Sequence, residues 1–170
     1  LSAGVVTVDA TLADYVRFWL TVVKRRVDEV TFQGYETLAD SHILPYFDRT
    51  GLKLQAVTCA DLQAYLDEKA QHGRKDGSGG LSPSSLRKHK NILYQTLTEA
   101  VKRELLPSNP CQFVELPAQQ PYESHYYTEA QLQTLFAAMA EDPMLPLVQI
   151  TALYGLRRSE LLGLKWDSID

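Results

Sequence analysis

The chain has 170 residues, a formal net charge of −4, 45% hydrophobic residues and 22% charged residues. This composition is that of an ordinary globular protein and excludes a disordered tail or a fibrous repeat. The length suits one ordinary domain or two small ones. No apolar run approaches the ~20 residues that a membrane-spanning helix needs, and the first residues do not have the pattern of a signal peptide, so we expect neither.

Charge is distributed unevenly along the chain. Residues 1–105 hold 14 Lys or Arg and 13 Asp or Glu, whereas residues 106–170 hold 3 and 8. An acidic total disfavours nucleic-acid binding at first sight. A DNA surface, however, needs only a local basic stripe on one face, so composition leaves the partner undecided.

The beginning of the chain predicts two helices. Residues 11–26 place apolar side chains at helical spacing, and Thr11 stands three residues before Asp14, as in a capping arrangement. A second helix is predicted for residues 31–43. Pro45 is expected to stop it, because proline has no backbone N–H to continue the ladder.

Two further helices follow before residue 106. The third is predicted for residues 58–72, and the glycine-rich residues 74–80 are typical of a flexible connector. Ser82 followed by Pro83 resembles an N-cap with proline at the first helical position. A fourth helix is expected to reach about Leu105. The four helices predict a compact bundle with short loops.

The second half of the chain predicts a linker and more helices. Residues 107–122 contain four prolines and predict an extended linker. Thr128 begins a capping box, residues 145–153 form an apolar helical pattern that Gly155 ends, and residues 159–164 predict a short helix. No segment has a strand pattern. The sequence therefore predicts an all-α fold.

Familiar signatures of enzyme sites are absent from the sequence. There is no His-Glu-x-x-His, no phosphate-binding glycine loop and no Cys/His cluster, so we expect no metal and no cofactor. The two cysteines, Cys59 and Cys111, form no Cys-x-x-Cys pair and favour a reducing compartment. The histidines are scattered, and we expect surface or capping positions for all of them. They are His42, His72, His89 and His125.

Polar side chains recur along one side of the predicted fourth helix. Arginine and lysine neutralise phosphates, and asparagine or glutamine can read adenine edges, so this mixture suits DNA. An ordinary solvated helix face is the alternative. The residues of this stripe are Arg87, Lys88, Lys90, Asn91, Gln95 and Lys102.

A second candidate site follows Gly155. Arg157 comes directly after the expected glycine turn, and we expect it to be held at the edge of a packed helix pair rather than in solvent. A guanidinium fixed in this way can clamp a phosphate with two hydrogen bonds. Glu160, one helical turn further on, could orient it. A helix–turn–helix hairpin with salt bridges is the alternative.

The run from Ala152 to Trp166, Ala-Leu-Tyr-Gly-Leu-Arg-Arg-Ser-Glu-Leu-Leu-Gly-Leu-Lys-Trp, closely resembles the first-arginine motif of tyrosine recombinases, the phage integrase family. Two upstream stretches, residues 31–47 and 81–110, are similar to that family's core-binding domain. The order and spacing of the three pieces are specific. The most similar members are integrases of phages and conjugative transposons from Gram-positive bacteria.

The resemblance implies a two-domain enzyme that clamps DNA from opposite sides. It implies a four-helix, SAM-like core-binding domain at residues 11–106, a linker at residues 107–122 and the beginning of a catalytic domain at residues 123–170. Such enzymes cut DNA through a 3′-phosphotyrosyl intermediate without a metal or nucleotide. Arg157 matches the first catalytic arginine, and Glu160 matches an acidic position that supports it.

The resemblance also implies partners and DNA contacts. We expect double-stranded DNA and, in a synaptic tetramer, other integrase protomers as partners, with no membrane association and a bacterial cytoplasmic location at the nucleoid. The expected DNA-contacting residues are Thr31, Gln33, Ser84, Arg87, Lys88, Lys90, Asn91 and Gln95.

The family's remaining active-site residues, including its tyrosine nucleophile, match nothing up to residue 170. We therefore expect this chain to be inactive in strand cleavage by itself and to be a fragment of an active recombinase. Two other classes remain open, a non-catalytic helical DNA-binding regulator and a helical protein-interaction module.

Overall fold

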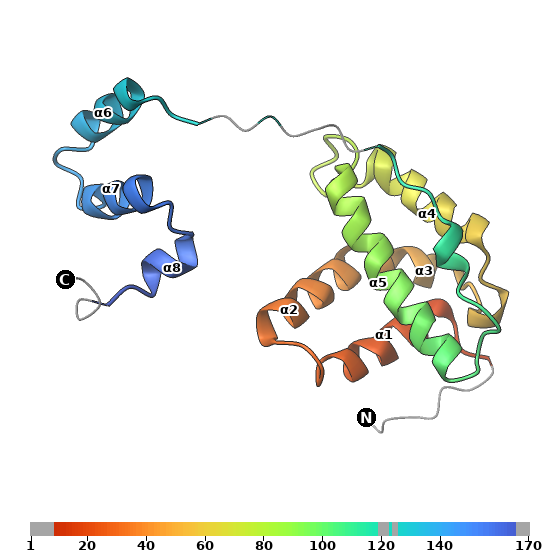
Figure 1. Ribbon diagram of the computed structural model, residues 1–170. Helices are drawn as coiled ribbons and strands as arrows, with labels where there is room; N and C mark the ends of the chain where they lie inside the picture. Colours follow the sequence, from red (N-terminus) through yellow and green to blue (C-terminus); the bar gives the residue numbers. More distant parts are fainter. Residues whose placement is uncertain (1–8, 119–122, 124–125, 166–170) are drawn as a thin grey trace. The chain divides into compact units, whose positions relative to one another are not determined.

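The computed structural model describes residues 9–118, 123 and 126–165 (Figure 1). Their regular structure is helical, apart from one isolated bridge between Thr11 and Lys53, which confirms the all-α prediction. Contacts divide the chain into two compact units, Leu1–Gln120 and Pro121–Asp170, which we describe separately.

The described part of the first unit has five α-helices. Two short 3₁₀ turns, Leu54–Ala56 and Pro110–Phe113, join or follow them. The α-helices are α1 (Leu12–Val23), α2 (Glu29–Leu38), α3 (Leu44–Thr50), α4 (Cys59–His72) and α5 (Pro83–Lys102).

Helix α1 forms where the apolar spacing predicted it. Thr11 caps its first turn: the Thr11 hydroxyl accepts from the Asp14 backbone N–H at 3.1 Å, and the Asp14 carboxylate accepts from the Thr11 N–H at 3.2 Å. The predicted apolar stripe, including Tyr15 and Trp19, is buried. A local cap and one buried face therefore suffice to place this helix.

The expected stop at Pro45 is wrong. Helix α2 continues through a π-helical turn, Ala39–Ile43, directly into α3, where Pro45 lies in the first turn. In the wider π turn, the Leu44 N–H reaches back five residues to the Ala39 carbonyl. Proline is tolerated there, since the first N–H groups of a new helix need no intrahelical partner. The second predicted helix is thus longer than expected and ends at Thr50, with Gly51 as its C-cap.

The connector before α5 is tied by hydrogen bonds, contrary to the flexible loop that its glycines suggested. The Arg74 N–H donates to the Gly79 carbonyl at 2.9 Å, and the Leu81 N–H donates to the Lys69 carbonyl at 2.9 Å. The Arg74 Nε donates to the Gly80 carbonyl at 3.1 Å. These bonds fold the loop back on the end of α4.

Helix α5 organises the core of the first unit. It contacts α1, α4, the π-helical turn and the second 3₁₀ turn, and Figure 1 shows it crossing the other helices. Its Leu93 and Leu97 side chains have no exposed surface, like Leu62 on α4 and Phe47 on α3. Burying one such side chain stabilises the fold by roughly 1.5–3 kcal/mol.

Part of the expected linker belongs to the first unit. Cys111 and Val114 are buried against it, although an extended linker was predicted from residue 107. The Asn109 side chain donates to the Tyr94 carbonyl at 2.9 Å and accepts from the Cys111 N–H at 2.9 Å. The prolines favoured an extended chain. Packing these apolar side chains on α4 and α5 removes apolar surface from water, however, and this stabilises the packed segment.

The second unit has three described helices, α6 (Glu129–Ala138), α7 (Leu145–Tyr154) and α8 (Arg158–Leu162). The predicted capping box at Thr128 is present: its hydroxyl accepts from the Gln131 N–H at 3.4 Å, and the Gln131 side chain accepts from the Thr128 N–H at 2.8 Å. None of the described residues of α6, α7 or α8 is buried.

Candidate nucleic-acid interface

A groove separates α2 and the π-helical turn from the first turns of α5. It measures about 630 Å³, and the hydrogen-bonded loop before α5 contributes to its rim. Most of its lining residues have polar or small side chains. The lining residues are Val30, Gln33, Gly34, Thr37, Leu38, Ser41, His42, Lys75, Leu81, Ser85, Lys88 and His89.

Cations without a carboxylate partner gather on the α5 side of this groove. Arg87, Lys88 and Lys75 are exposed, and the described residues provide none of them with a salt bridge. Elsewhere in the unit the arginines are largely neutralised. The pairs include Arg17–Asp48 at 2.6 Å, Arg26–Glu99 at 3.1 Å and Arg49–Glu68 at 3.0 Å. The groove margin therefore carries local positive charge although the whole chain is acidic.

The structure brings several predicted contact residues together here. Gln33 on α2 and Lys88 on α5 line the two walls of the groove. Arg87 and Asn91 are exposed on the same face of α5, and Ser84 is exposed in its first turn. Of this set, Gln33 and Lys88 line the groove itself, whereas Ser84, Arg87 and Asn91 are exposed on α5 outside the groove lining.

Three other predicted contact residues lie differently. Thr31 donates from its backbone and hydroxyl to the Asp28 carboxylate, at 2.9 and 2.8 Å, and so serves the cap of α2. The Lys90 ammonium donates to the Val114 carbonyl at 2.6 Å and anchors the segment after α5. Gln95 lines a separate small groove beside α1. None of the three lines the groove between α2 and α5.

Sequence reasoning missed Lys75, Thr37 and Ser41, which also line the groove. Lys75 lies in the loop that composition alone described as a connector. Its basic character was visible in the sequence, but only the hydrogen bonds that fold this loop back place it beside α5. Thr37 lies four residues after Gln33 on α2, and this helical spacing could have identified it.

Two histidines meet at the groove, contrary to the expected scattering. His89 is only 2% exposed, and its Nδ1 shares a hydrogen bond of 2.7 Å with the Tyr65 hydroxyl. The His42 and His89 rings lie 5.1 Å apart between centroids. Burial lowers the pKa of His89 to about 4, with smaller contributions from His42 and Lys69, so this imidazole is neutral at pH 7.

The turn before α8 holds the second candidate site. Gly155 ends α7 with a left-handed φ of +65°, which glycine adopts without strain. The Arg157 N–H donates to Glu160 Oε2 at 2.7 Å, and its guanidinium pairs with Glu160 Oε1 at 3.2 Å. The Arg157 side chain is 84% exposed, so the expected burial at a helix edge is wrong. Among the described residues, Glu160 is the one side chain that pairs with the Arg157 guanidinium.

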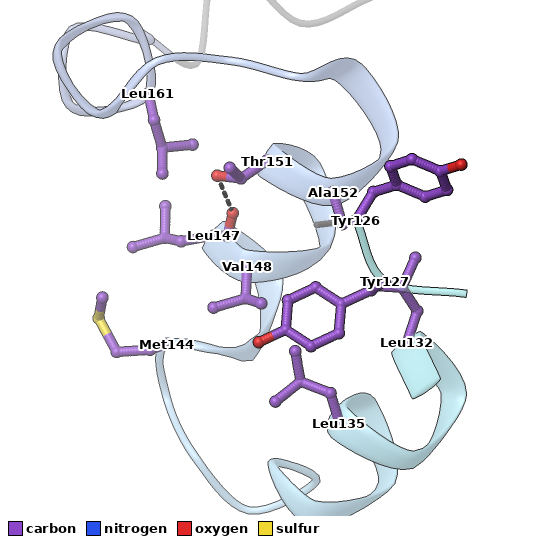
Figure 2. Close-up of a pocket in the computed structure, with 10 residues that line it drawn as sticks. All are labelled: Tyr126, Tyr127, Leu132, Leu135, Met144, Leu147, Val148, Thr151, Ala152 and Leu161. Atoms are coloured by element: carbon purple, nitrogen blue, oxygen red, sulfur yellow. Dashed lines mark hydrogen bonds between the residues drawn. The ribbon is translucent and has the colours of Figure 1, made fainter. Parts of the chain in front are cut away.

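An apolar groove of about 490 Å³ lies within the second unit. Tyr127 and Leu135 come from the α6 side and Val148 from α7, and Figure 2 shows the three side chains facing one another. The Thr151 hydroxyl donates to the Leu147 carbonyl of the same helix, α7, at 2.8 Å. The lining is mostly hydrocarbon and aromatic and includes no carboxylate, imidazole or thiol, and its polar side-chain groups are the hydroxyls of Tyr126, Tyr127 and Thr151.

The described residues contain neither a metal-binding cluster nor a membrane-spanning helix. No group of three or more His, Cys, Asp or Glu side chains gathers where it could hold a metal ion. Among the described helices none has the length and apolar content to cross a bilayer.

Comparisons with known proteins agree with this architecture. Residues 11–70 match the family model described as phage integrase, N-terminal SAM-like domain. The chain is 26% identical over 172 residues to a XerC-like tyrosine recombinase of Caldanaerobacter subterraneus subsp. tengcongensis, a match that covers 95% of the chain and 41% of that protein. The first unit is thus similar to the N-terminal SAM-like domain of phage integrases, and the chain as a whole is similar to a tyrosine recombinase.

Solved integrase structures share the fold. The Tn1549 transposon integrase in complex with circular intermediate DNA matches with a TM-score of 0.73 and 21% identity, over 94% of this chain and 51% of that one. The lambda integrase dimer bound to a COC′ core site matches with a TM-score of 0.74 and 17% identity, over 95% and 44%. The chain thus spans about half the length, or less, of these relatives.

Proposed function

We propose that the first unit binds duplex DNA as the core-binding part of a site-specific tyrosine recombinase. The observation that carries this proposal is the gathering of carboxylate-free cations, Arg87, Lys88 and Lys75, beside the groove between α2 and α5. In an acidic chain whose other arginines are largely paired, this local positive face suits a polyanion.

The cationic and the amide side chains of this surface make different contributions to DNA binding. Arg87 and Lys88 neutralise phosphates, which supplies affinity that does not depend on sequence. The Gln33 and Asn91 amides can pair with adenine edges, which supplies sequence preference. Both kinds are exposed on adjoining elements of the same unit.

The second unit supplies the first catalytic arginine in this proposal. Arg157 stabilises the charge on the scissile phosphate, and Glu160, already paired with it at 3.2 Å, orients the guanidinium. The high exposure of Arg157 is compatible with this role, since a phosphate must reach it. The complete enzyme would integrate or excise a mobile element through a 3′-phosphotyrosyl intermediate, working with other protomers on the same DNA.

Charge reversal at the groove tests the binding proposal. Arg87→Glu/Lys88→Glu should weaken binding of this chain to a 20-bp duplex and lower the magnitude of the slope of log Kd against log salt by about 2, since two phosphate contacts are lost. Fluorescence anisotropy between low and moderate salt measures both quantities.

Lys24→Glu/Arg25→Glu is the matched control for the charge reversal. It changes the net charge equally at exposed positions outside the groove. Equal weakening by both variants would show a general charge effect and contradict the assignment. A wild-type chain without DNA affinity at any salt would favour the protein-interaction module instead.

Arg157→Lys tests the catalytic proposal in a protein that contains this chain together with a tyrosine nucleophile. Lysine keeps the charge but loses the planar fork, so cleavage of a suicide DNA substrate should fall by about 10²–10³. DNA affinity should stay within about twofold, because binding is spread over many phosphates. Arg158→Lys is the control, and loss of cleavage in that variant alone would assign the role to Arg158.

A further inference from the structure

The segment after α5 turns back beside this helix, as Figure 1 shows, before the chain continues toward the second unit. We call residues 109–116 of this segment the strap. Its Cys111 and Val114 side chains are 0% and 3% exposed, and Leu116 packs partly buried against the same core. The strap therefore belongs to the packed first unit, and the connection to the second unit begins only after it.

Hydrogen bonds to α5 fix the direction of the strap. At its beginning, the Asn109 amide donates to the Thr98 hydroxyl at 2.9 Å. Further along, the Val114 carbonyl accepts from the Lys90 ammonium at 2.6 Å. The strap and α5 thus run antiparallel. From Lys102, the last residue of α5, back to Lys90 the helix covers about 18 Å. The strap carries the chain over this distance toward the first turns of α5, which line the groove.

A side chain of α4 holds the other end of the strap. The Gln63 side-chain oxygen accepts from the Glu115 N–H at 2.9 Å, and its nitrogen donates to the Glu115 carbonyl at 3.2 Å. Gln63 therefore satisfies both backbone groups of Glu115, which a paired strand would otherwise do. Because Glu115 is exposed and adds no apolar surface to the core, these bonds hold the backbone where burial ends.

The docked strap limits the reach of the connection between the units. Eleven residues, 117–127, separate Leu116 from the Thr128 cap of α6, and they span at most about 40 Å. Without the strap, the connection would start after Leu106, at the far end of α5, and its 21 residues, 107–127, would span at most about 75 Å. The local concentration of a tethered module falls roughly as the −3/2 power of linker length. A docked strap therefore raises the concentration of the second unit near the groove.

We propose that the strap positions the second unit on DNA that is bound at the groove between α2 and α5. Gln63 and Asn109 are its positioning residues, one at each end. This inference rests on the proposed DNA-binding function, and it adds how the unit that holds Arg157 reaches the duplex that the first unit binds.

The first test measures strap docking in this chain without DNA. In a Cys59→Ser background Cys111 is the one thiol, and burial raises its pKa to about 12. Its labelling by 5,5′-dithiobis(2-nitrobenzoic acid) should be about 100-fold slower than in urea, or more, because the thiol is covered and protonated. Gln63→Ala/Asn109→Ala should speed labelling about tenfold, since both ends of the strap lose hydrogen bonds. Gln112→Ala, which removes an exposed amide between these ends, should keep the wild-type rate.

A pair of insertions tests the positioning role in a protein that contains this chain together with a tyrosine nucleophile. About 20 Gly/Ser residues inserted after Ala118 lengthen the connection itself, so cleavage of a suicide DNA substrate should fall about fivefold. The same insertion after Pro107 lengthens only the loop between α5 and the docked strap. Cleavage by that variant should stay within about twofold of the wild type. DNA affinity should stay within about twofold in both variants, because neither insertion changes a groove residue.

The outcomes separate this inference from the proposed function. Equal cleavage by the two insertion variants would overturn the inference, whether both lose activity or both keep it. Thiol labelling as fast in the folded chain as in urea would overturn it too, because the strap would then not be docked. A wild-type chain without DNA affinity would instead contradict the proposed function, while the labelling, measured without DNA, would still report the state of the strap.

Discussion

The two units of this chain use similar local signals and reach different degrees of burial. Helix α4 in the first unit and α6 in the second each begin with a threonine capping box, at Thr58 and Thr128. Yet Leu93 of α5 has no exposed surface, whereas Leu153 of α7 is 76% exposed. Caps and propensity therefore produce helices in both units, but only the first surrounds a core.

The difference follows from helix length and placement. Helix α5 has 20 residues and contacts elements on several sides, so its apolar face is covered along its length. The described helices of the second unit have 10, 10 and 5 residues, and they leave an apolar groove open among them. Apolar side chains stabilise a unit only where other elements take them out of water.

The largest expected effect comes from paired leucine truncations. Leu93→Ala should lower the free energy of unfolding of the first unit by about 2–5 kcal/mol, because it removes buried methyl groups and leaves a cavity. Leu153→Ala should change it by less than about 0.5 kcal/mol, since an exposed side chain loses little contact. Urea denaturation followed by circular dichroism and tryptophan fluorescence measures both.

Equal destabilisation by the two truncations would contradict the comparison, because it would mean that both units unfold as one cooperative body. Trp19 lies in the core of the first unit, so both truncations are made in a Trp166→Phe background, in which tryptophan fluorescence reports the first unit alone.

A smaller effect should appear with pH in the first unit. Burial holds the pKa of His89 near 4 in the folded chain, below its ordinary value of about 6.5. The unfolded state therefore binds the proton first as the pH falls, so stability is full above about pH 6.5 and declines toward pH 4. Between pH 7 and pH 5 this histidine should lower the free energy of unfolding by about 2 kcal/mol.

His89→Gln checks the assignment, because glutamine can keep a hydrogen bond with Tyr65 but does not titrate. Its unfolding free energy should vary less with pH over the same interval. Burial also lowers the pKa of His42. In the His89→Gln variant, His42 should therefore leave a small residual dependence of the unfolding free energy on pH. A variant with the full wild-type slope would show that another group causes the loss.

Much of the helical architecture was predictable from local sequence. Thr11 with Asp14, Ser82 with Pro83, and Thr128 each marked a helix start that the structure confirms. These signals work because a cap satisfies backbone N–H groups within one turn and needs no distant partner. Apolar spacing likewise identified the buried faces of α1 and α5.

Tertiary structure decided the features that depend on distant partners. Pro45 was compatible with a helix end or a helix start, and only packing of α2 and α3 on α1, and of the π-helical turn on α5, selected the continuous π-helical path. Cys111 and Val114 have no periodic pattern, and α4 and α5 bury them all the same.

The candidate site shows the same division. The sequence by itself placed Arg87, Lys88 and Asn91 on one helix face, since a helical period fixes which residues share a face. Only the fold placed Gln33 and Lys75 at the same groove and buried His89 against Tyr65, because these side chains come from separate elements. Local hydrogen bonding determines where helices form. The surface between helices depends on how their apolar faces pack against one another and are buried from water.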